Sequence, residues 1–200
     1  MTSEFVKSVS AFPKTRPGTS VVTLGTFDGI HRGHQEIFGR VKTIAADTGL
    51  RPVLITFHPH PRVVVSPNDI PMLLTSIEEK EKFIPDFFDG SVLVLEFNRE
   101  LMNLTAEEFV RRVLVDLVGV RHLVVGYDHA LGKDRTGDIP ELKRLGGDLG
   151  FDVEVVDPVY FGDAPVSSTR IRKAMTAGRY SEAIQLLGHE YAISLSLIHI

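Results

Sequence analysis

Two histidines separated by two residues lie in the segment of the chain whose residue types are best suited to bind phosphate. Residues 25–34 read GTFDGIHRGH and follow a short β-branched run. Glycines in this segment let a ligand approach the backbone closely. A helix beginning after it would offer free N–H groups and partial positive charge to an anion. His31 and His34 would face that anion, and because the P-loop pattern is absent, the segment predicts phosphate chemistry of another kind.

A metal site is the second interpretation of these histidines. Four of them fall at the predicted ends of the first two strands and could converge: His31, His34, His58 and His60. Zinc accepts nitrogen ligands, although four histidines are not a usual structural set. The stretch 58–61 is stiffened by its prolines, and neighbouring side chains of an extended segment point opposite ways. A metal site therefore ranks below phosphate binding, and an ordinary loop is the third alternative.

A second candidate anion site lies in residues 166–173, which read VSSTRIRK. Hydroxyl groups at a predicted helix start are followed by basic residues without any acid, a combination that binds anions. An ordinary Ser/Thr cap on a basic helix would look the same. Beside a nucleotide site the anion reading is favoured, because a triphosphate needs positive charge on two sides.

A third segment follows a later predicted strand. Residues 126–137 read GYDHALGKDRTG, and their glycines and mixed charges suit a ligand-binding loop. A surface loop without function is nearly as well supported by the same residues.

The elements that would position these segments alternate along the chain. Buried strands are predicted at 21–24, 53–57, 91–97, 122–126 and 151–156. Between them, helical spacing runs from Ile37 to Gly49, from a capping box at Thr105 to Gly119, and over 141–149. A second capping box at Ser76 precedes a short helix, and short helices are expected at 168–177 and 181–187. This order predicts an α/β fold: a doubly wound, Rossmann-like parallel sheet of about five strands with a small C-terminal helical extension.

The composition limits the class of protein. Hydrophobic residues make up 43% and charged residues 24% of the 200 residues, which excludes wholesale disorder. The formal net charge of -4 argues against nucleic acid bound through overall charge. With no cysteine, disulfides and thiolate metal sites are excluded. Residues 1–11 do not resemble a secretory signal, and no stretch approaches the ~20 apolar residues of a membrane span. We expect a cytoplasmic protein with small-molecule partners and neither nucleic acid nor a membrane.

Taken together, these segments resemble a known family. The HxGH pattern of His31 to His34 is that of the nucleotidylyltransferases, and Phe27-Asp28-Gly29 ahead of it resembles the FAD synthetase module of the bifunctional riboflavin kinase/FMN adenylyltransferases. Residues 56–61, 126–137 and 166–172 agree with that family, as do Leu74-Thr75 and Glu79-Lys80. The resemblance implies transfer of AMP from ATP to FMN with Mg²⁺, giving FAD and pyrophosphate.

The resemblance also implies roles for individual residues. The catalytic residues would be His31, His34 and Arg170. The nucleotide site would comprise Gly25, Thr26, Phe27, Asp28, Gly33, Gly126, Asp128, Arg135, Ser168, Thr169 and Arg172. The flavin would lie towards Phe57, His58, Pro59, His60 and Pro61. No protein ligand for the metal is implied, since ATP phosphates and water are expected to hold the Mg²⁺.

The chain departs from the family pattern in two places. Residues 188–194, GHEYAIS, resemble the first residues of the family's riboflavin kinase domain, and 195–200, LSLIHI, resemble a translated sequencing adapter. We therefore expect an adenylyltransferase domain over 1–187, a truncated kinase start over 188–194 and a non-native tail, with kinase activity only in a longer natural protein. His129-Ala130 stand where many relatives carry Phe and a basic residue.

Three alternatives stay open at this point. One is another HxGH nucleotidylyltransferase, acting on pantetheine phosphate, nicotinate mononucleotide or glycerol phosphate. Another is an inactive module that binds flavin or nucleotide without turnover. The last is a structural zinc-binding domain.

Overall fold

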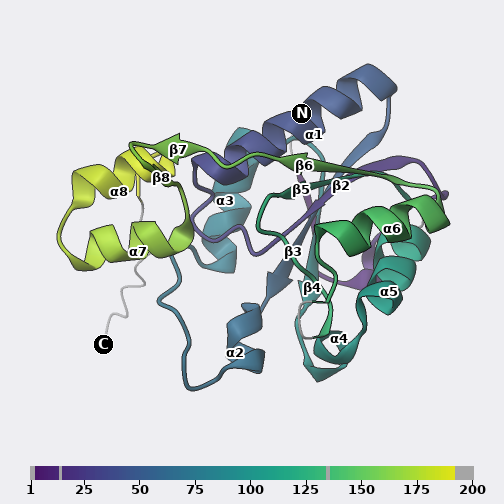
Figure 1. Ribbon diagram of the computed structural model, residues 1–200, viewed down its shortest axis with the longest axis horizontal. Coiled ribbons are helices and arrows are strands. Elements are labelled where there is room, and N and C mark those ends of the chain that lie inside the picture. The colour runs from purple at the N-terminus through teal and green to yellow at the C-terminus, as the bar shows by residue number, and fades with distance from the viewer. Residues whose placement is uncertain (1–2, 14, 134–135, 192–200) are drawn as a thin grey trace, which may run out of the picture.

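The fold is built on one parallel sheet. The structure is a computed structural model that describes residues 3–13, 15–133 and 136–191. Its main sheet has six strands in the order β1-β4-β3-β2-β5-β6, and every pairing is parallel. The strands are β1 (Glu4–Val6), β2 (Ser20–Leu24), β3 (Arg51–His58), β4 (Ser91–Glu96), β5 (Val120–Gly126) and β6 (Asp152–Val156). The predicted doubly wound parallel sheet is confirmed (Figure 1).

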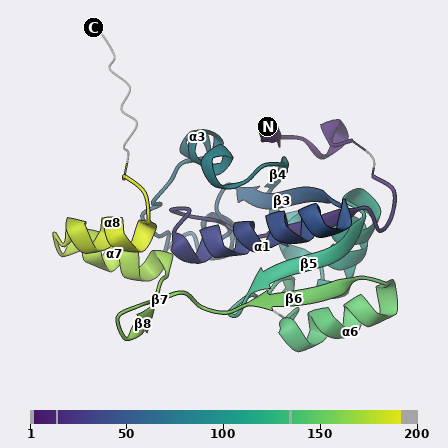
Figure 2. The ribbon, with the colours of Figure 1, turned by 90° about the horizontal axis from the view of Figure 1, so that it is seen from above.

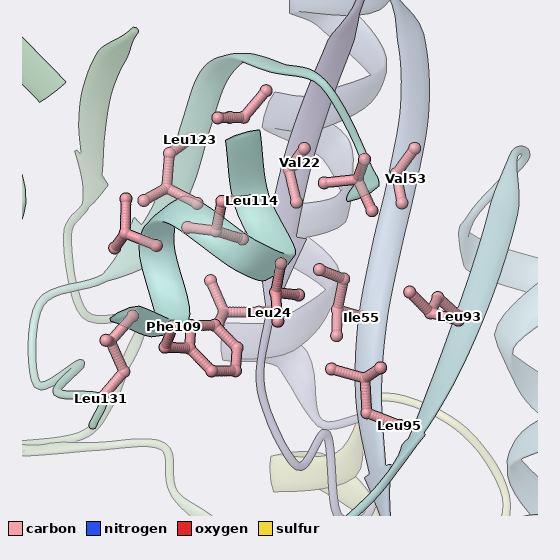
Figure 3. Packing of buried hydrophobic residues seen from close by; sticks show 14 of the residues in the cluster. Val22, Leu24, Val53, Ile55, Leu93, Leu95, Phe109, Leu114, Leu123 and Leu131 are labelled. Atoms are coloured by element: carbon pink, nitrogen blue, oxygen red, sulfur yellow. The ribbon is translucent and has the colours of Figure 1, made fainter. Parts of the chain in front are cut away.

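Helices cover both faces of this sheet because successive strand residues point to opposite sides. On one face Val21, Leu54 and Val92 pack with α1 (Arg32–Thr48) and α3 (Ile77–Phe87). On the other face the neighbouring residues Val22 and Ile55 pack with three other helices (Figure 3). Those helices are α5 (Ala106–Phe109), η2 (Val110–Leu117) and α6 (Ile139–Leu149). In Figure 2, β5 and β6 lie between α1 and α6.

The strand order places a ligand-binding position at the end of β2. From β2 the chain passes through α1 to β3 on one side, whereas β5 lies on the other side of β2. The winding direction therefore reverses at β2. In open α/β sheets, ligands bind outside the carboxyl ends of the strands at such a switch point.

Several predicted helix ends are confirmed. Both capping boxes form: Ser76 accepts from the N–H of Glu79, and Thr105 accepts from that of Glu108. α1 ends at Gly49, whose φ of 70° is left-handed. α6 begins at Ile139, two residues before the predicted start, because Asp138 caps it.

A small C-terminal unit packs against the end of the sheet. It consists of α7 (Ser168–Thr176) and α8 (Tyr180–Leu187), with the β7 (Tyr160–Phe161) and β8 (Ala164–Pro165) hairpin beside them. Ile171, Leu186 and Leu187 form its core and are fully buried. Both figures show this unit at the end of α1 at which that helix begins (Figures 1 and 2). The predicted helical extension is confirmed.

Five short strands and α-helices were not expected from the sequence. They are β1, the hairpin of β7 and β8, and two five-residue helices, α2 (Pro61–Val65) and α4 (Arg99–Asn103). A short turn of helix, η1 (Val9–Ala11), follows β1, and the helix expected after Thr105 becomes π-helical at η2. β1 lies at the edge of the sheet, and its three residues provide no apolar run that the sequence pattern could detect.

Within the described residues, no helix is long and apolar enough to cross a membrane.

Replacing Phe38 tests the face of the sheet that carries α1. Phe38 is fully buried and its ring lies 4.9 Å from the Phe27 ring. We expect Phe38→Ala to lower the free energy of unfolding by about 3–5 kcal/mol, because it removes an aromatic ring from a packed core. Urea denaturation measures this. Glu36→Ala, at an exposed position of the same helix, should change it by no more than about 0.5 kcal/mol, and equal effects would contradict the packing described.

Candidate active site

The HxGH segment begins as a strained turn at the carboxyl end of β2. Phe27 and Ile30 have positive φ angles of 45° and 43°, although neither is glycine. Such a conformation costs about 1–3 kcal/mol per residue and persists only where surrounding packing imposes it. Here both side chains are buried, and a Cβ on Gly29 would lie 2.8 Å from Leu74 Cδ1. The shape of the turn is therefore imposed by what packs on it.

Asp28 is the anchor of this turn. Its carboxylate is 1% exposed and accepts hydrogen bonds from the backbone N–H groups of Leu74 at 2.9 Å and Thr75 at 3.0 Å. The same carboxylate forms an ion pair with Arg172 of α7. One side chain thus joins the turn to the segment before α3 and to the C-terminal unit.

Further contacts hold the C-terminal unit on the turn. Ser168 donates its hydroxyl to the carbonyl of Asp28 at 2.8 Å. The Nε2 atom of His189 lies 3.0 Å from the carbonyl of Gly29. Gln35 of α1 donates to the carbonyl of Leu187 at 2.8 Å. The second predicted anion site is therefore brought against the first.

The two histidines of the motif form a stacked pair. The rings of His31 and His34 have centroids 3.6 Å apart and planes inclined by 18°. The Phe27 ring packs edge-on against the His34 ring, with ring centroids 5.3 Å apart. A Cβ on Gly33 would lie 3.3 Å from the His31 ring, so the glycine keeps space for it. Among the described residues, the buried Nδ1 atoms of both histidines have no hydrogen-bond partner. Such atoms are rare in folded proteins, so these two ring nitrogens are candidates to bind a ligand.

Burial keeps both imidazoles neutral. It lowers the pKa of His31 from 6.5 to about 4, and the nearby Asp28 carboxylate only partly offsets this. Burial also lowers the pKa of His34 well below its usual value, and the His31 and Lys80 charges act in the same direction. A neutral imidazole still carries one N–H group that can donate to a phosphate oxygen.

Two helix N-termini meet at this site. α1 begins after His31, which makes no side-chain capping hydrogen bond within the described part of the chain. α7 begins after Ser167, whose hydroxyl accepts from the N–H of Arg170. A Cβ on Gly33 would lie 3.9 Å from the carbonyl of Val166, so the two helix starts are neighbours. Free N–H groups and partial positive charge of both helices therefore face the same region.

The two arginines of α7 are held in place by other groups. Arg170 donates to the carbonyls of Phe161 at 2.9 Å and Ala164 at 2.8 Å, and it lies 3.4 Å from the Glu182 carboxylate. Arg172 donates to the carbonyl of Met72 at 2.7 Å besides its ion pair with Asp28. Thr169 is exposed at the first turn of α7.

The loop after β5 lies beside the start of α1. A Cβ on Gly126 would lie 3.4 Å from Ile37 Cδ1 and 3.6 Å from the Asp128 carboxylate. Asp128 itself is exposed. Arg135, which the sequence predicts to contact the nucleotide, lies outside the described residues.

The stretch expected to face the flavin begins in the last two residues of β3, the strand next to β2. Phe57 packs edge-on against Phe97 at 5.7 Å. His60 caps α2 by accepting from the N–H of Arg62, and the His58-Pro59 peptide bond is cis. Burial lowers the pKa of His60. The structure thus brings this stretch to the same edge of the sheet as the histidine pair, from the side opposite β5.

One residue at the site received no role from the sequence. Lys80 of α3 is 5% exposed, and its ammonium group donates to the carbonyl of Thr26 at 2.6 Å. Its position four residues before Ile84 and eight before Phe88 places it on the buried face of α3. A lysine within a buried apolar stripe is the signal in the sequence that could have identified it.

The metal site considered above would use four histidines that all lie among the described residues. No group of three or more His, Asp or Glu side chains that could hold a metal ion occurs among residues that the structure describes.

A double-mutant cycle tests the Asp28–Arg172 ion pair. Asp28→Asn leaves the Arg172 charge without its partner, so we expect a loss of about 2–4 kcal/mol in unfolding free energy, moderated by the partial exposure of Arg172. Arg172→Gln in the Asp28→Asn background should add little. The pair of Arg62 and Asp69 is exposed on both sides, so Asp69→Asn should cost at most about 1 kcal/mol. Additive effects of the first two substitutions would contradict the coupling.

The low pKa of His31 predicts a dependence of stability on pH. Between pH 6.5 and 4 the unfolded chain binds a proton at His31 that the folded chain does not, so stability falls as pH falls. From pH 7 to pH 5 the wild type should lose about 2 kcal/mol more unfolding free energy than His31→Gln. Urea denaturation at both pH values measures the difference, and equal losses would show that His31 titrates normally.

Comparison with known proteins agrees with this geometry. The family model described as FAD synthetase matches residues 14–170. A bifunctional riboflavin kinase/FMN adenylyltransferase of Pseudomonas fluorescens is 39% identical over 179 residues, which cover 90% of this chain and 57% of that protein. The chain therefore spans less than two thirds of this relative's length.

Two solved structures are also similar. A macrolide-efflux protein from Streptococcus pneumoniae is 29% identical with a TM-score of 0.80, over 94% of this chain and 62% of that one. A pantoate-beta-alanine ligase from Francisella tularensis is 11% identical with a TM-score of 0.55, over 93% of this chain and 85% of that one. At this identity the likeness shows the fold alone. Since the family model covers more than half of the sequence, the chain belongs to the FAD synthetase family.

Proposed function

We propose that this chain is an FMN adenylyltransferase, which transfers AMP from ATP to the phosphate of FMN and gives FAD and pyrophosphate. One observation carries this proposal. The His31 and His34 rings stack at the start of α1, at the end of β2 and opposite the start of α7, and their buried Nδ1 atoms have no hydrogen-bond partner among the described residues. The family to which the chain belongs supports the same reaction.

The reaction needs positioning and charge stabilisation more than covalent chemistry. An oxygen of the FMN phosphate forms a bond to the α-phosphorus of ATP. The bond from that phosphorus to the bridging oxygen breaks, and pyrophosphate leaves with the electron pair. We propose that His31 and His34 donate N–H groups to the phosphate oxygens as negative charge shifts towards the leaving group.

The first turn of α7 would hold the leaving pyrophosphate. Thr169 supplies its hydroxyl, Ser168 and Thr169 supply backbone N–H groups, and the start of α7 adds partial positive charge. The proposed role of Arg170 is to fix α7 on the β7–β8 hairpin through its carbonyl contacts and to contact the leaving pyrophosphate. Arg172 contributes through Asp28, and together they set the distance between the two helix starts.

The remaining proposed contacts divide between the two substrates. Gly25, Gly33, Gly126 and Asp128 lie on the β2, α1 and β5 side, where we place the nucleotide. Thr26 and Phe27 shape the turn beneath it. The stretch 57–61 lies on the β3 side, where we place the flavin.

Mg²⁺ enters this proposal with the substrate. The described residues offer no cluster of metal ligands, and the Asp28 carboxylate is engaged by Arg172 and backbone N–H groups. Mg²⁺ prefers phosphate oxygens and water in such sites. We therefore treat it as part of MgATP and assign no step to a protein-bound metal.

The relatives are longer than the part that this chain matches, which is 57% of the Pseudomonas fluorescens protein. We propose that the riboflavin kinase activity in the relatives' names belongs to the part of those proteins beyond the match, and that a domain boundary lies near residues 187–188. Residues 195–200, the expected non-native tail, lie outside the described residues. We also propose a cytoplasmic location and small-molecule partners. Nothing in the described site favours the efflux function named for the similar Streptococcus pneumoniae structure.

An acceptor panel tests the function against its nearest rivals. We expect pyrophosphate release from MgATP with FMN, and none above background with pantetheine phosphate, nicotinate mononucleotide or glycerol phosphate. Release with one of those three instead of FMN would assign the site to another nucleotidylyltransferase. Binding of FMN and ATP without release would indicate an inactive module.

Substitution of His34 tests the catalytic role of the pair. We expect His34→Ala to lower kcat by about 10²- to 10³-fold, the usual effect of losing one donor to developing charge. Pyrophosphate release with FMN and MgATP measures it. His122→Ala is the matched control, because His122 lies near the opposite end of β5 beside Asp152. Full activity of His34→Ala would remove His34 from the mechanism.

A further inference from the structure

The buried ammonium group of Lys80 has more hydrogen-bond donors than its contact with Thr26 uses. Its ammonium group has three N–H donors, and one of them is used within the described residues, by the carbonyl of Thr26 at 2.6 Å. That carbonyl already receives the Thr56 hydroxyl at 3.3 Å. The side chain is 5% exposed, so solvent can satisfy little of what remains. A buried ammonium group with donors to spare is unfavourable unless an anion binds it.

The packing of α3 places Lys80 on the buried face of that helix. The fully buried Ile84 lies one turn further along the same face of α3. The start of α3 is fixed by the Ser76–Glu79 capping box. Just before it, the N–H of Thr75 is bonded to Asp28. The ammonium group is therefore held at the end of β2 by the same contacts that fix the HxGH turn.

The charges around Lys80 leave it uncompensated. The Asp28 carboxylate raises its pKa, but that carboxylate is paired with Arg172, and burial outweighs it and lowers the pKa of Lys80 to about 8. The charge of Lys80 in turn lowers the pKa of His34 and of His60. Lys80 is therefore close to both the proposed nucleotide side and the proposed flavin side.

We propose that Lys80 is a further catalytic residue, whose ammonium group binds the phosphate of FMN and holds it for attack on the α-phosphorus of ATP. This inference rests on the proposed adenylyltransferase function. The FMN phosphate is favoured over the ATP phosphates because Lys80 comes from α3 and shares the Thr26 carbonyl with Thr56 of β3. The two helix starts that suit ATP lie at α1 and α7.

The chemical role is electrostatic and needs no proton transfer. Two phosphate groups of like charge must approach before the new oxygen–phosphorus bond can form, and a fixed cation between them offsets their repulsion. The electron pair still leaves with pyrophosphate, and the ammonium group keeps its protons throughout.

The binding of FMN and of riboflavin, which differ only by the phosphate, tests this contact. Flavin fluorescence is titrated with wild type, Lys80→Met and the control Lys82→Met in the presence of α,β-methylene-ATP. Lys82 is an exposed residue of the same helix. Lys80→Met should weaken FMN binding by about 10- to 100-fold, the usual range for a charged hydrogen bond. Riboflavin binding should stay unchanged, and Lys82→Met should behave as wild type.

A merely structural lysine would give a different result. If Lys80 only held the turn, Lys80→Met would weaken FMN and riboflavin equally, which would overturn the inference. Unchanged FMN binding with weaker binding of the ATP analogue would also overturn it, since the contact would then be to the nucleotide. If the wild type makes no FAD from FMN and MgATP, the proposed function fails, and that outcome is distinct from a failure at Lys80.

The pH dependence provides a second measurement that applies even if Lys80→Met does not fold. Because the pKa of Lys80 is about 8, the wild type should lose affinity for FMN, but not for riboflavin, as pH rises from 8 to 9.5. Lys80→Arg keeps its charge over that range and should hold FMN at pH 9.5 as it does at pH 7.5. An identical alkaline loss in Lys80→Arg would contradict the inference.

Discussion

The buried carboxylate of Asp28 is the interaction on which the site depends. It binds backbone N–H groups before α3 and the guanidinium group of α7, while its own residue belongs to the turn between β2 and α1. Three segments that are far apart in the sequence are thereby fixed at one point. The strained angles of Phe27 and Ile30 persist because this anchor and the packing on Gly29 impose them. The distance between the two anion-binding helix starts follows from the same contact.

The charges of the site are arranged around an anion. Positive charge comes from Lys80, from Arg172 and from the starts of α1 and α7. These positive charges would repel a protonated His31 or His34. Burial prevents their protonation because it lowers the pKa values of both histidines. The histidines therefore offer N–H donors without net charge until a phosphate arrives. An anionic substrate would then stabilise groups that are costly to bury without it.

Much of this arrangement is predictable from the sequence because it is local. Strands β2 to β6 appear as apolar runs, and helix ends follow from caps at Ser76, Thr105 and Gly49. The HxGH segment stands out because its residue types and its place after a strand agree. What is not local is harder to predict. Asp28 and Arg172 are 144 residues apart, and nothing in their immediate neighbours indicates that they pair. The edge strand β1 has three residues and pairs with β4 on one side.

The role of Lys80 is only partly predictable from the sequence. Its spacing with Ile84 and Phe88 places it on a buried face, but which carbonyl it meets depends on how α3 packs against the end of β2. For Arg170, the sequence and the structure point to different contacts. Its sequence context resembles a phosphate ligand, whereas its contacts in the structure are carbonyls of a hairpin that the sequence did not predict.

The most direct test of the account is the fate of each phosphate of ATP. The chain is incubated with FMN, Mg²⁺ and ATP that carries a radiolabel at either the α- or the γ-phosphorus, and the products are separated by chromatography. We expect the α-label to appear in FAD and the γ-label in pyrophosphate, because the histidine pair and α7 hold the nucleotide for attack on the α-phosphorus. Transfer of the γ-label to the flavin, or no transfer of the α-label, would contradict it.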